Sequence, residues 1–469
     1  MTAALPVGRL RGGALAHRIL RAARPQTGAI LRHGAALLAL FLFCLSHYLN
    51  RSFGRPDFDQ IAYHLSYGLD LASDADPVLV RRFVRWCVLA PPAIWGVIVW
   101  AERRWGAALA GRWRAALQAW PPALLLAALL YWALQLSLLS HIAAAYGTDY
   151  FSANYVPPET IALRVERPKN LVLIYVESLE SSYARPALFG KNLLAPLDAL
   201  GGTSFEAYRQ APGTGWTIAA IVATQCGVPL KRVSVFDGNR QGELLKSFLP
   251  NATCLGDLLS AHGYRNVFMA GAAARFAGKE KFLHDHHYDA ILGKEDWLRE
   301  GVRADEMNGW GLYDVALLAR ARQQVRQLEA AGRPYNLTLL TVDTHEPAGH
   351  LSRSCAQRGL REFEGVIECS AQDVAGLVRY MKENGYLAHT NVVILGDHLS
   401  RRNPVTDKLP PLAERHIYNA FISEQDLRKN TEQITHFDLL PTILTMSGFE
   451  FAGGRLGLGY SAFGRQPQA

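Results

Sequence analysis

Apolar and polar positions follow different patterns in the two parts of this chain. Before residue 150, three stretches carry no Asp, Glu, Lys or Arg: 33–50, 86–101 and 115–148. The second is short and contains two prolines, whereas the third gives the strongest signal. Because a helix needs about 20 such residues to cross the hydrocarbon core of a bilayer, we expect residues 1–150 to form a membrane anchor with about three transmembrane helices.

After a linker over residues 151–164, short β-branched runs alternate with amphipathic stretches. The runs predict buried strands at 170–178, 265–271, 335–343 and 391–398. Helical periodicity is present at 314–332 and 371–386. Strands that alternate with helices form a doubly wound, mostly parallel sheet with helices on both faces. We therefore expect an α/β domain over residues 165–455, followed by a C-terminal tail over residues 456–469.

Arginines beside the apolar stretches explain much of the formal net charge of +8. Cytoplasmic loops collect arginine because its translocation is costly. The cytoplasmic segments expected on this basis precede the first span (Arg9, Arg11, Arg18, Arg21, Arg24, Arg32) and follow the second (Arg103, Arg104, Arg112, Arg114). Three arginines just before the second span oppose this assignment: Arg81, Arg82 and Arg85. An odd number of spans then places everything after Tyr150 outside the cytoplasm.

Two other interpretations of the N-terminal part fit less well. The basic charge could indicate nucleic-acid binding, but the sequence contains no zinc-finger spacing, RNA-binding signature or long basic run. We therefore expect no nucleic-acid partner. The first apolar stretch could be a cleaved signal peptide, although no convincing small-x-small site follows it. A membrane anchor remains the preferred interpretation.

The cysteines agree with an extracytoplasmic domain. Four of the six lie in the C-terminal part, an even number in a compartment that permits disulfides: Cys226, Cys254, Cys355 and Cys369. Spacing does not fix their pairing, although the last two could close a short surface loop. Cys44 and Cys87 lie in apolar segments and are expected to pack there.

Ionisable residues stand at the ends of three expected strands. Glu177 ends the first, His345 follows the third, and Asp397 with His398 ends the fourth. Ligands of open parallel sheets bind outside the carboxyl ends of the strands, and this oxygen and nitrogen donor set suits zinc or manganese, with magnesium as a third option. The alternative is that these acids only cap the helices that follow.

The segment 212–230, PGTGWTIAAIVATQCGVPL, begins rich in Gly and Thr and continues apolar. This pattern suggests a hydroxyl at a helix N-terminus, where backbone N–H groups favour a phosphate. Thr217 is then a candidate nucleophile, because a metal can lower the pKa of a hydroxyl. The alternative is that Thr214 and Thr217 are helix caps and nothing more.

Several motifs, in order, resemble the sulfatase/alkaline-phosphatase superfamily: NLVLIYVESLESSY, GTGWTIAAIVATQCGVPL, FAGKEKF, WGLYD, TVDTHEP, VVILGDHLSRRN and HFDLLPTIL. Within it, the chain is most similar to the phosphoglycerol transferases of osmoregulated periplasmic glucans and, more distantly, to lipoteichoic acid synthases. The match covers most of residues 165–450. It implies an alkaline-phosphatase-like catalytic domain.

The resemblance also implies roles for individual residues. One divalent metal ion would be held by Glu177, Thr217, Asp397 and His398, with Thr217 as the nucleophile. His345 matches the position that contacts the phosphate or the leaving group. Substrate binding falls to Trp216 and to the region where relatives bind the glycerophosphate head group, which here contains Arg275, Phe276 and Lys279. His436 could face the site, although we favour a packing or capping role.

The function expected from this resemblance is the transfer of sn-glycerol-1-phosphate from phosphatidylglycerol to a glycan acceptor, a periplasmic glucan. The protein would lie in a bacterial inner membrane with its catalytic domain in the periplasm. The alternative within the class is phosphoethanolamine transfer to a lipid or glycan. A sulfatase-like hydrolase fits less well, because sulfatases need a Cys or Ser converted to formylglycine. A non-catalytic sensor would have lost a metal ligand or the nucleophile, and all are present.

The first testable prediction concerns topology. A reporter that is active only in the periplasm, fused after Ala469, should be active, because three spans and the arginine bias place this end outside the cytoplasm. A cytoplasmic reporter fused at the same position serves as the control and should stay silent. The opposite pair of results would reverse the orientation and reject the lipid-donor hypothesis.

Overall fold

The computed structural model describes residues 12–53, 77–105, 111–136, 153–230, 247–410 and 414–464. Its internal contacts divide the chain into two compact units. The helical unit contains residues 1–50 and 78–139, and the sheet unit contains residues 51–77 and 140–469.

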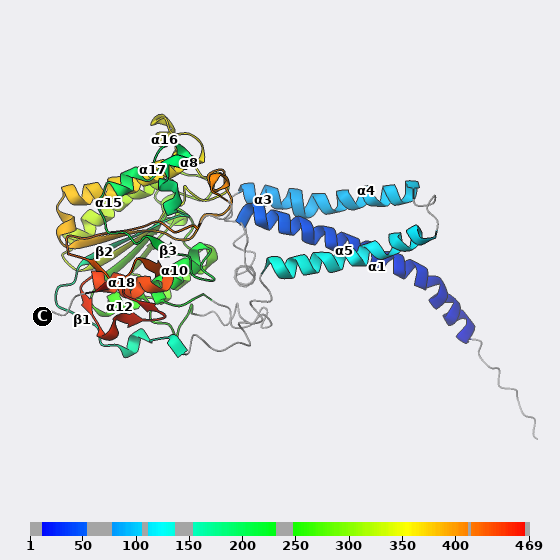
Figure 1. The fold of residues 1–469 in the computed structure, drawn as a ribbon, viewed down its shortest axis with the longest axis horizontal. Coiled ribbons are helices and arrows are strands. Elements are labelled where there is room, and N and C mark those ends of the chain that lie inside the picture. The colour runs from blue at the N-terminus through cyan, green and yellow to red at the C-terminus, as the bar shows by residue number, and fades with distance from the viewer. Residues whose placement is uncertain are drawn as a thin grey trace, which may run out of the picture. The chain divides into compact units, whose positions relative to one another are not determined.

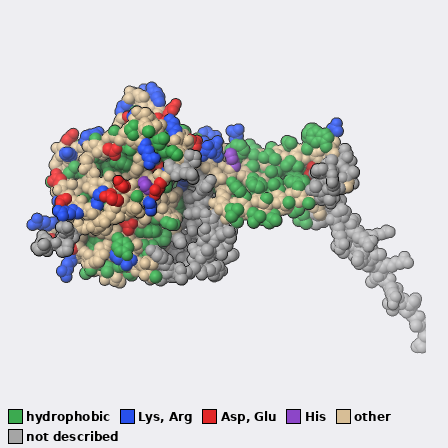
Figure 2. All heavy atoms as spheres, viewed as in Figure 1, with side chains coloured by type: hydrophobic (Ala, Val, Ile, Leu, Met, Phe, Trp, Pro, Cys, Tyr) green, Lys and Arg blue, Asp and Glu red, His purple; other side chains and the backbone are tan. Residues whose placement is uncertain are grey.

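The helical unit contains α1 (Gly12–Phe53), α4 (Ala90–Trp105) and α5 (Arg112–Gln135), with α3 (Pro77–Phe83) leading through a π-helical turn into α4. Hydrogen bonds join α1 to α5 in the described residues. Trp132 Nε1 donates to the Leu42 carbonyl oxygen (2.9 Å), and Gln135 Nε2 donates to Asn50 Oδ1 (2.9 Å). Hydrophobic side chains cover most of the visible face of this unit (Figure 2).

Two helical segments among the described residues are long and apolar enough to cross a membrane, Gly28–Ser52 and Val78–Trp105. Only 17% and 11% of their most apolar windows are buried, which is unlike the core helix of a soluble protein. Ala119–Gln135 is a shorter apolar helix. The rest of the third expected span, from residue 137, lies outside the described residues, so a count of three spans stays a prediction.

The sheet unit is built on one six-stranded sheet in the order β5-β4-β6-β2-β7-β8 (Figure 1). Its strands are β2 (Asn170–Val176), β4 (Arg265–Ala270), β5 (Ala290–Leu292), β6 (Tyr335–Leu340), β7 (Thr390–Gly396) and β8 (Asn419–Ile422). All neighbours pair in parallel except β7 and β8. The four expected strands are confirmed, and the two additional strands are the short ones at the edges.

Helices cover both faces of this sheet. Alternate side chains of a strand point to opposite faces, and in β2 both sets are apolar and buried. Leu171, Leu173 and Tyr175 of β2 join the core beneath α10 (Thr217–Cys226), α12 (Leu255–Ala261) and α18 (Leu439–Met446). Val172, Ile174 and Val176 join the core beneath α15 (Asp314–Ala330) and α17 (Glu362–Glu383). The expected fold class, a doubly wound and mostly parallel α/β sheet, is therefore confirmed.

One helix is longer than expected. α17 begins at Glu362 instead of residue 371, because Phe363, Val366 and Ile367 extend its buried face by more than two turns.

The remaining helices and strands are short: α8 (Pro186–Phe189), α9 (Ala195–Asp198), α13 (Lys279–Asp285), α14 (Lys294–Arg299), α16 (Arg353–Gln357), β1 (Arg164–Val165), β3 (Ala207–Arg209), β9 (Arg428–Lys429), β10 (Gln433–Thr435), β11 (Phe449–Glu450), β12 (Arg455–Leu456), β13 (Gly459–Tyr460) and β14 (Phe463–Gly464).

The segments at either end of the expected catalytic domain pack onto the sheet unit. Val156, in the linker, forms a β-bridge with Gly457. Leu456 and Phe463, in the stretch that the sequence sets apart as a tail, are buried in the core beneath α10 and α18. The packed unit thus includes residues on both sides of 165–455.

Two disulfides join the four cysteines of the sheet unit. Cys355 bonds to Cys369, so the short loop that their spacing allowed is closed, and Cys226 bonds to Cys254. Cys226 is the last residue of α10, so the second disulfide fixes the end of that helix. Cys44 and Cys87 are buried and unbonded in the helical unit.

Candidate metal centre

The candidate metal ligands meet because β2 lies between β6 and β7 in the sheet. Glu177 directly follows β2, and Asp397 and His398 directly follow β7. All three are at most 3% exposed, and each offers a ligand atom within 4.8 Å of those of the other two. His398 Nε2 lies 3.5 Å from Glu177 Oε1 and 3.4 Å from Asp397 Oδ2. The expected trio is therefore a compact cluster at the carboxyl edge of the sheet.

The hydrogen bonds of this cluster leave two potential metal-ligand atoms available to a cation. Asp397 Oδ1 accepts from the backbone N–H groups of Ser178 (2.7 Å) and His398 (2.9 Å), whereas buried Oδ2 has no hydrogen-bond partner among the described residues. His398 Nδ1 lies 3.0 Å from the Leu399 carbonyl. Donation of Nδ1–H there leaves Nε2 free to bind a metal. These residues fit a divalent ion.

Electrostatics support the same conclusion. Burial raises the pKa of Asp397 to about 7, despite hydrogen bonds from Ser178 and His398 that act against it. Burial, together with the charge of Asp397, also raises the pKa of Glu177. Two buried carboxyl groups that disfavour each other's charge are stabilised as carboxylates by a cation between them.

Thr217 is the first residue of α10 and lies beside this cluster. Its Oγ1 is 3.4 Å from Glu177 Oε2, in position to donate a hydrogen bond. The N-cap of the helix is Trp216, not a threonine. Thr214 Oγ1 donates instead to the Ala211 carbonyl (2.7 Å) within the preceding turn. The structure thus separates the two threonines, with only Thr217 hydrogen-bonded to a candidate metal ligand.

His345 approaches Glu177 from the β6 side. It forms a second group with Glu177 and Glu346, whose ligand atoms all lie within 4.8 Å of one another. Its ring is 4.6 Å from the ring of Trp310, and its Nδ1 is 2.8 Å from the Glu346 carbonyl oxygen. The ring orientation is therefore set by one aromatic contact and one backbone hydrogen bond.

The expected substrate-binding residues differ in their surroundings. Lys279 is buried, donates from Nζ to the Phe276 carbonyl (2.7 Å), and lies 5.0 Å from the centre of the Phe276 ring. Burial lowers the pKa of Lys279 to about 8, although the charge of Glu177 opposes this. The Phe276 ring packs 5.4 Å from Trp310, the same ring that contacts His345. These contacts connect the Phe276 and Lys279 region with the metal cluster.

The other two residues of this set lie differently. Arg275 pairs with Glu295 of α14 (3.4 Å), and its side chain is 53% exposed. Trp216 is buried beside Thr217 in the core beneath α10. Arg275 therefore neutralises a surface carboxylate, and substrate contact by either residue stays a prediction.

Several supporting residues were missed by the sequence analysis. Ser178 has a positive φ of 53°, donates from Oγ to Glu177 Oε1 (2.8 Å), and donates from its backbone N–H to Asp397. Glu180, fully buried, forms an ion pair with Arg415. The polar VESLES run hinted at Ser178 and Glu180, but no local pattern pointed to a partner 235 residues away.

Glu346 was also missed, although it adjoins His345 in the THEP motif. It is buried, and its Oε1 accepts hydrogen bonds from Ser400 Oγ (2.7 Å) and from the backbone N–H of Arg401. Burial alone would raise the pKa of Glu346, but the charges of Arg401 and the nearby histidines outweigh it and lower the pKa to about 2. Glu346 therefore holds the loop after β7 as a carboxylate.

His436 contacts the backbone of the metal-ligand candidate Asp397. It is fully buried, and its Nε2 lies 2.8 Å from the Asp397 carbonyl oxygen, while Nδ1 lies 3.3 Å from the Ala211 backbone nitrogen. Burial lowers its pKa to about 3, so the ring is neutral and can both donate and accept. These contacts agree with the packing role that we favoured.

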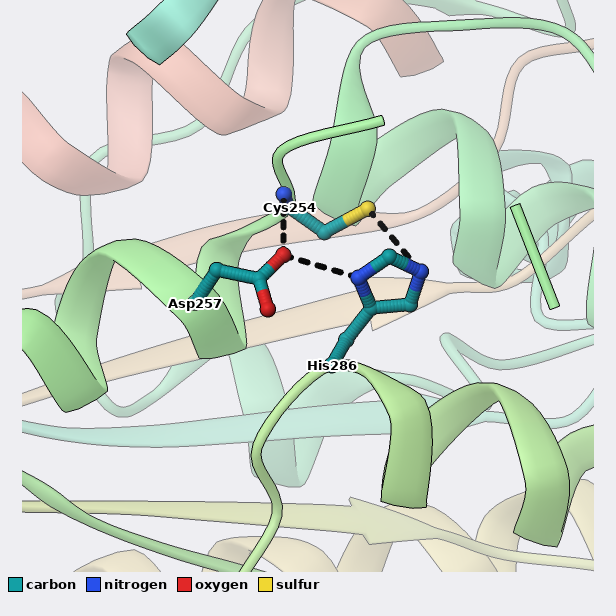
Figure 3. A group of neighbouring side chains, drawn as sticks. All are labelled: Cys254, Asp257 and His286. Atoms are coloured by element: carbon teal, nitrogen blue, oxygen red, sulfur yellow. Dashed lines mark hydrogen bonds and ion pairs between the residues drawn. The ribbon is translucent and has the colours of Figure 1, made fainter. Parts of the chain in front are cut away.

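A third cluster resembles a metal site only in its composition. Cys254, Asp257 and His286 point toward one another (Figure 3), with 2.7 Å between Asp257 Oδ2 and His286 Nδ1. Cys254 Sγ is bonded to Cys226, so it offers no thiolate. Asp257 also accepts from the backbone N–H of Cys254 (2.8 Å) as part of a capping box for α12. This cluster is structural.

A family model matches the sheet unit. The sulfatase model matches residues 169–449, which include every element that contributes to the cluster. The chain belongs to the sulfatase family. The matched region begins one residue before β2 and ends within β11, so the resemblance seen in the motifs extends through the whole sheet.

Among curated proteins, the chain is similar to phosphoglycerol transferase I of Escherichia coli O139:H28 and of Shigella boydii serotype 18. Each is 38% identical over 267 residues, which cover 55% of this chain and 34% of the relative. The match therefore spans about a third of the length of these relatives.

Solved structures give more distant similarities. One is a protein of the alkaline phosphatase superfamily from Vibrio parahaemolyticus (20% identity, TM-score 0.48, 68% of this chain and 75% of that chain). Another is the lipoteichoic acid synthase LtaP from Listeria monocytogenes (16% identity, TM-score 0.48, 69% of this chain and 81% of that chain).

The metal cluster yields a prediction about Asp397. Asp397→Asn keeps an oxygen that can accept the Ser178 and His398 bonds but removes the charge, so bound divalent metal should fall sharply. Loss of an outer hydrogen-bond partner costs about 10–100-fold in metal affinity, and loss of a direct ligand should cost more. Elemental analysis of purified protein and a metal titration measure the effect.

The matched control is Asp426→Asn, because the Asp426 side chain is 82% exposed and lies outside the cluster. This variant should keep the wild-type metal content. Undiminished metal in Asp397→Asn, with an unchanged melting temperature, would reject Asp397 as a ligand.

Proposed function

We propose that this chain is a membrane-bound phosphotransferase that moves sn-glycerol-1-phosphate from phosphatidylglycerol to a glycan, specifically a periplasmic glucan. The observation that carries the proposal is the position of Thr217, whose Oγ1 lies 3.4 Å from Glu177 Oε2 at the start of α10. A hydroxyl at a helix N-terminus beside a metal-binding cluster is suited to attack a phosphate.

The residues around the nucleophile have separate tasks in this proposal. Glu177, Asp397 and His398, with Thr217, hold one divalent ion, manganese or zinc, with magnesium as a third option. Such an ion lowers the pKa of a hydroxyl and offsets charge on phosphate oxygens. His345 stands on the β6 side of Glu177, where it reaches the phosphate or the leaving oxygen. Lys279 and Phe276 bind the glycerophosphate head group.

The first chemical step forms a bond between Thr217 Oγ1 and phosphorus while the bond from phosphorus to the diacylglycerol oxygen breaks. Glu177 Oε2 lies in position to accept the hydroxyl proton, and this proton ends on the leaving alkoxide, which departs as diacylglycerol. The glycerophosphate remains attached to Thr217. In-line displacement of this kind depends mainly on positioning and electrostatic stabilisation.

In the second step Thr217 is the leaving group instead of the nucleophile. A hydroxyl oxygen of the acceptor glycan attacks phosphorus, its proton leaves, and the bond to Thr217 Oγ1 breaks, so Thr217 regains a proton. Over both steps one proton passes from the acceptor hydroxyl to diacylglycerol, and the phosphodiester count is unchanged.

The helical unit gives this chemistry a physical setting. Its apolar helices would anchor the enzyme in a bacterial inner membrane with the sheet unit in the periplasm. A tether that keeps the enzyme beside its lipid donor raises the effective concentration of that donor at the site. The similarity to phosphoglycerol transferase I supports phosphoglycerol as the transferred group.

The covalent step can be tested with Thr217→Ala. Wild-type protein incubated with phosphatidylglycerol, metal and no acceptor should gain a glycerophosphate adduct on the peptide containing Thr217, with a burst of diacylglycerol close to one per enzyme. Thr217→Ala should give neither product, because it lacks the attacking oxygen, while keeping metal through its other ligands. Mass spectrometry and lipid analysis measure both.

Two controls sharpen the test. Thr217→Ser keeps a hydroxyl and should still form the adduct, whereas Thr160→Ala changes an exposed threonine and should behave as wild type. Head-group-labelled phosphatidylethanolamine, offered in parallel, should give no adduct if the donor is phosphatidylglycerol. Full diacylglycerol release by Thr217→Ala would reject the covalent mechanism, and an adduct on Thr214 or Ser178 would move the nucleophile.

A further inference from the structure

A cleft of about 600 Å³ lies on the sheet unit beside the short strands that follow α18. Its walls come from residues 430–431, residue 445 of α18, residues 449–454 and residues 460–464. Asn430 joins two of these walls, because its backbone N–H donates to the Ala462 carbonyl oxygen (2.8 Å) and its Nδ2 donates to the Ser461 carbonyl oxygen (3.3 Å). Ligand pockets have volumes of about 300–1,000 Å³, so the cleft is large enough for a small ligand.

The cleft is separate from the metal cluster. His436, in the turn before α18, contacts the Asp397 carbonyl oxygen, whereas Thr445, which lines the cleft, lies near the other end of α18. The helix between Leu439 and Thr445 is about 9 Å long, at 1.5 Å per residue. The cleft is therefore a different surface from the sheet edge that carries the proposed nucleophile.

Tyr460 gives this cleft an exposed aromatic ring. The residue is 55% exposed, and the Arg455 guanidinium lies over the ring, 4.5 Å from its centre. Arg455 Nη2 also donates to the Asn154 carbonyl oxygen (2.8 Å), so a second contact holds the guanidinium in place. A ring that is already fixed by a cation loses little conformational entropy when a ligand stacks on it.

The rest of the lining is polar but carries little charge. Amide and hydroxyl groups come from Asn430, Thr431 and Ser461. Among the described residues that line the cleft, Glu450 is the only charged one. An anionic ligand would meet this carboxylate and no cationic lining residue, whereas a neutral ligand rich in hydroxyl groups would meet both donors and acceptors. The chemistry of the lining therefore favours a neutral polyol.

Two glycines leave part of the main chain accessible in one wall. Gly453 and Gly454 have φ values of 73° and 62°, in the left-handed region that favours glycine. A Cβ placed on Gly453 would meet no other atom within 4 Å. Because no side chain covers this turn, a ligand can approach its backbone N–H and carbonyl groups closely.

We propose that this cleft binds a neutral glycan, with one pyranose ring stacked on Tyr460 and its hydroxyl groups hydrogen-bonded to the polar lining. The C–H face of a pyranose is apolar and its edge carries hydroxyl groups, so an aromatic ring flanked by polar side chains matches both. A polymeric acceptor held here has a raised effective concentration at Thr217. Glycan binding rests on the cleft alone, whereas the identity of the glycan as the acceptor rests on the proposed function.

Calorimetric titration of the full-length protein with a neutral periplasmic glucan, stripped of phosphoglycerol groups, tests the cleft. No donor lipid is added, and the detergent has no sugar head group that would compete. Tyr460→Ala should weaken glucan binding about tenfold, because the stacked ring is lost. Tyr460→Phe keeps the ring and should bind as the wild type does. Thr431→Trp fills the cleft from another wall and should also weaken binding.

The matched control is Leu298→Ala, which changes a residue of α14 that is 56% exposed and does not line the cleft. This variant should bind the glucan as the wild type does. Melting temperatures identify any misfolded variant, and Thr431→Trp decides the matter if Tyr460→Ala is misfolded. The cleft is rejected by three results: no glucan binding by the wild type, unchanged affinity in folded Tyr460→Ala, or equal losses in Tyr460→Ala and Tyr460→Phe. Tyr460-dependent binding of dextran sulfate in place of the glucan would reject a neutral ligand.

The adduct experiment on Thr217 uses no acceptor, so its outcome does not depend on the cleft. An adduct on Thr217, together with unchanged glucan affinity in Tyr460→Ala, would reject the cleft and leave the transferase in place. Tyr460-dependent glucan binding without an adduct or a diacylglycerol burst would support the cleft and reject the transferase mechanism.

Discussion

Burial of negative charge at one edge of the sheet is the constraint on which the rest of the site depends. Glu177, Asp397 and Glu346 are each at most 3% exposed, within a fold that places β2 between β6 and β7. Removing an ion from water costs several kcal/mol even after relaxation. Backbone N–H groups offset part of this cost at Asp397 and Glu346, yet one oxygen of each stays unpartnered among the described residues. The unpartnered Asp397 oxygen beside Glu177 and His398 therefore fits a cation.

The loops that carry these carboxylates are held by contacts between distant parts of the chain. His436, in the turn before α18, hydrogen-bonds to the Asp397 carbonyl oxygen, and Glu346 accepts hydrogen bonds from Ser400 and Arg401 in the loop after β7. Arg415 pairs with buried Glu180 and also donates to the Ser400 carbonyl. Each bond restricts where a ligand atom can lie. Such preorganisation is what a metal centre requires, because small displacements of ligands weaken binding.

The sequence allowed the core of this arrangement to be predicted, because local patterns carry it. Buried β-branched runs identify the four central strands, and a polar residue directly after such a run marks the carboxyl edge where Glu177, Asp397 and His398 meet. Much of what could not be predicted depends on contacts between residues far apart in the sequence, such as Glu346 with Ser400 and Glu180 with Arg415. The edge strands β5 and β8 were not predicted, because three or four residues give no clear periodicity. The ion pair of Arg275 with Glu295 is likewise visible only in the fold, and substrate contact by Arg275 stays a prediction.

Helix α10, which begins with the proposed nucleophile Thr217, is fixed at both ends. At its start Thr217 is hydrogen-bonded to Glu177, and at its end Cys226 is bonded to Cys254. Its residues from Ile218 to Cys226 are buried, so the helix cannot shift without disturbing the core. A nucleophile that does not move must have its substrate brought to it. In the proposed mechanism, discrimination between lipid head groups then falls to the side chains around Thr217, and buried Lys279, packed on Phe276 and within electrostatic reach of Glu177, is a basic side chain suited to that task.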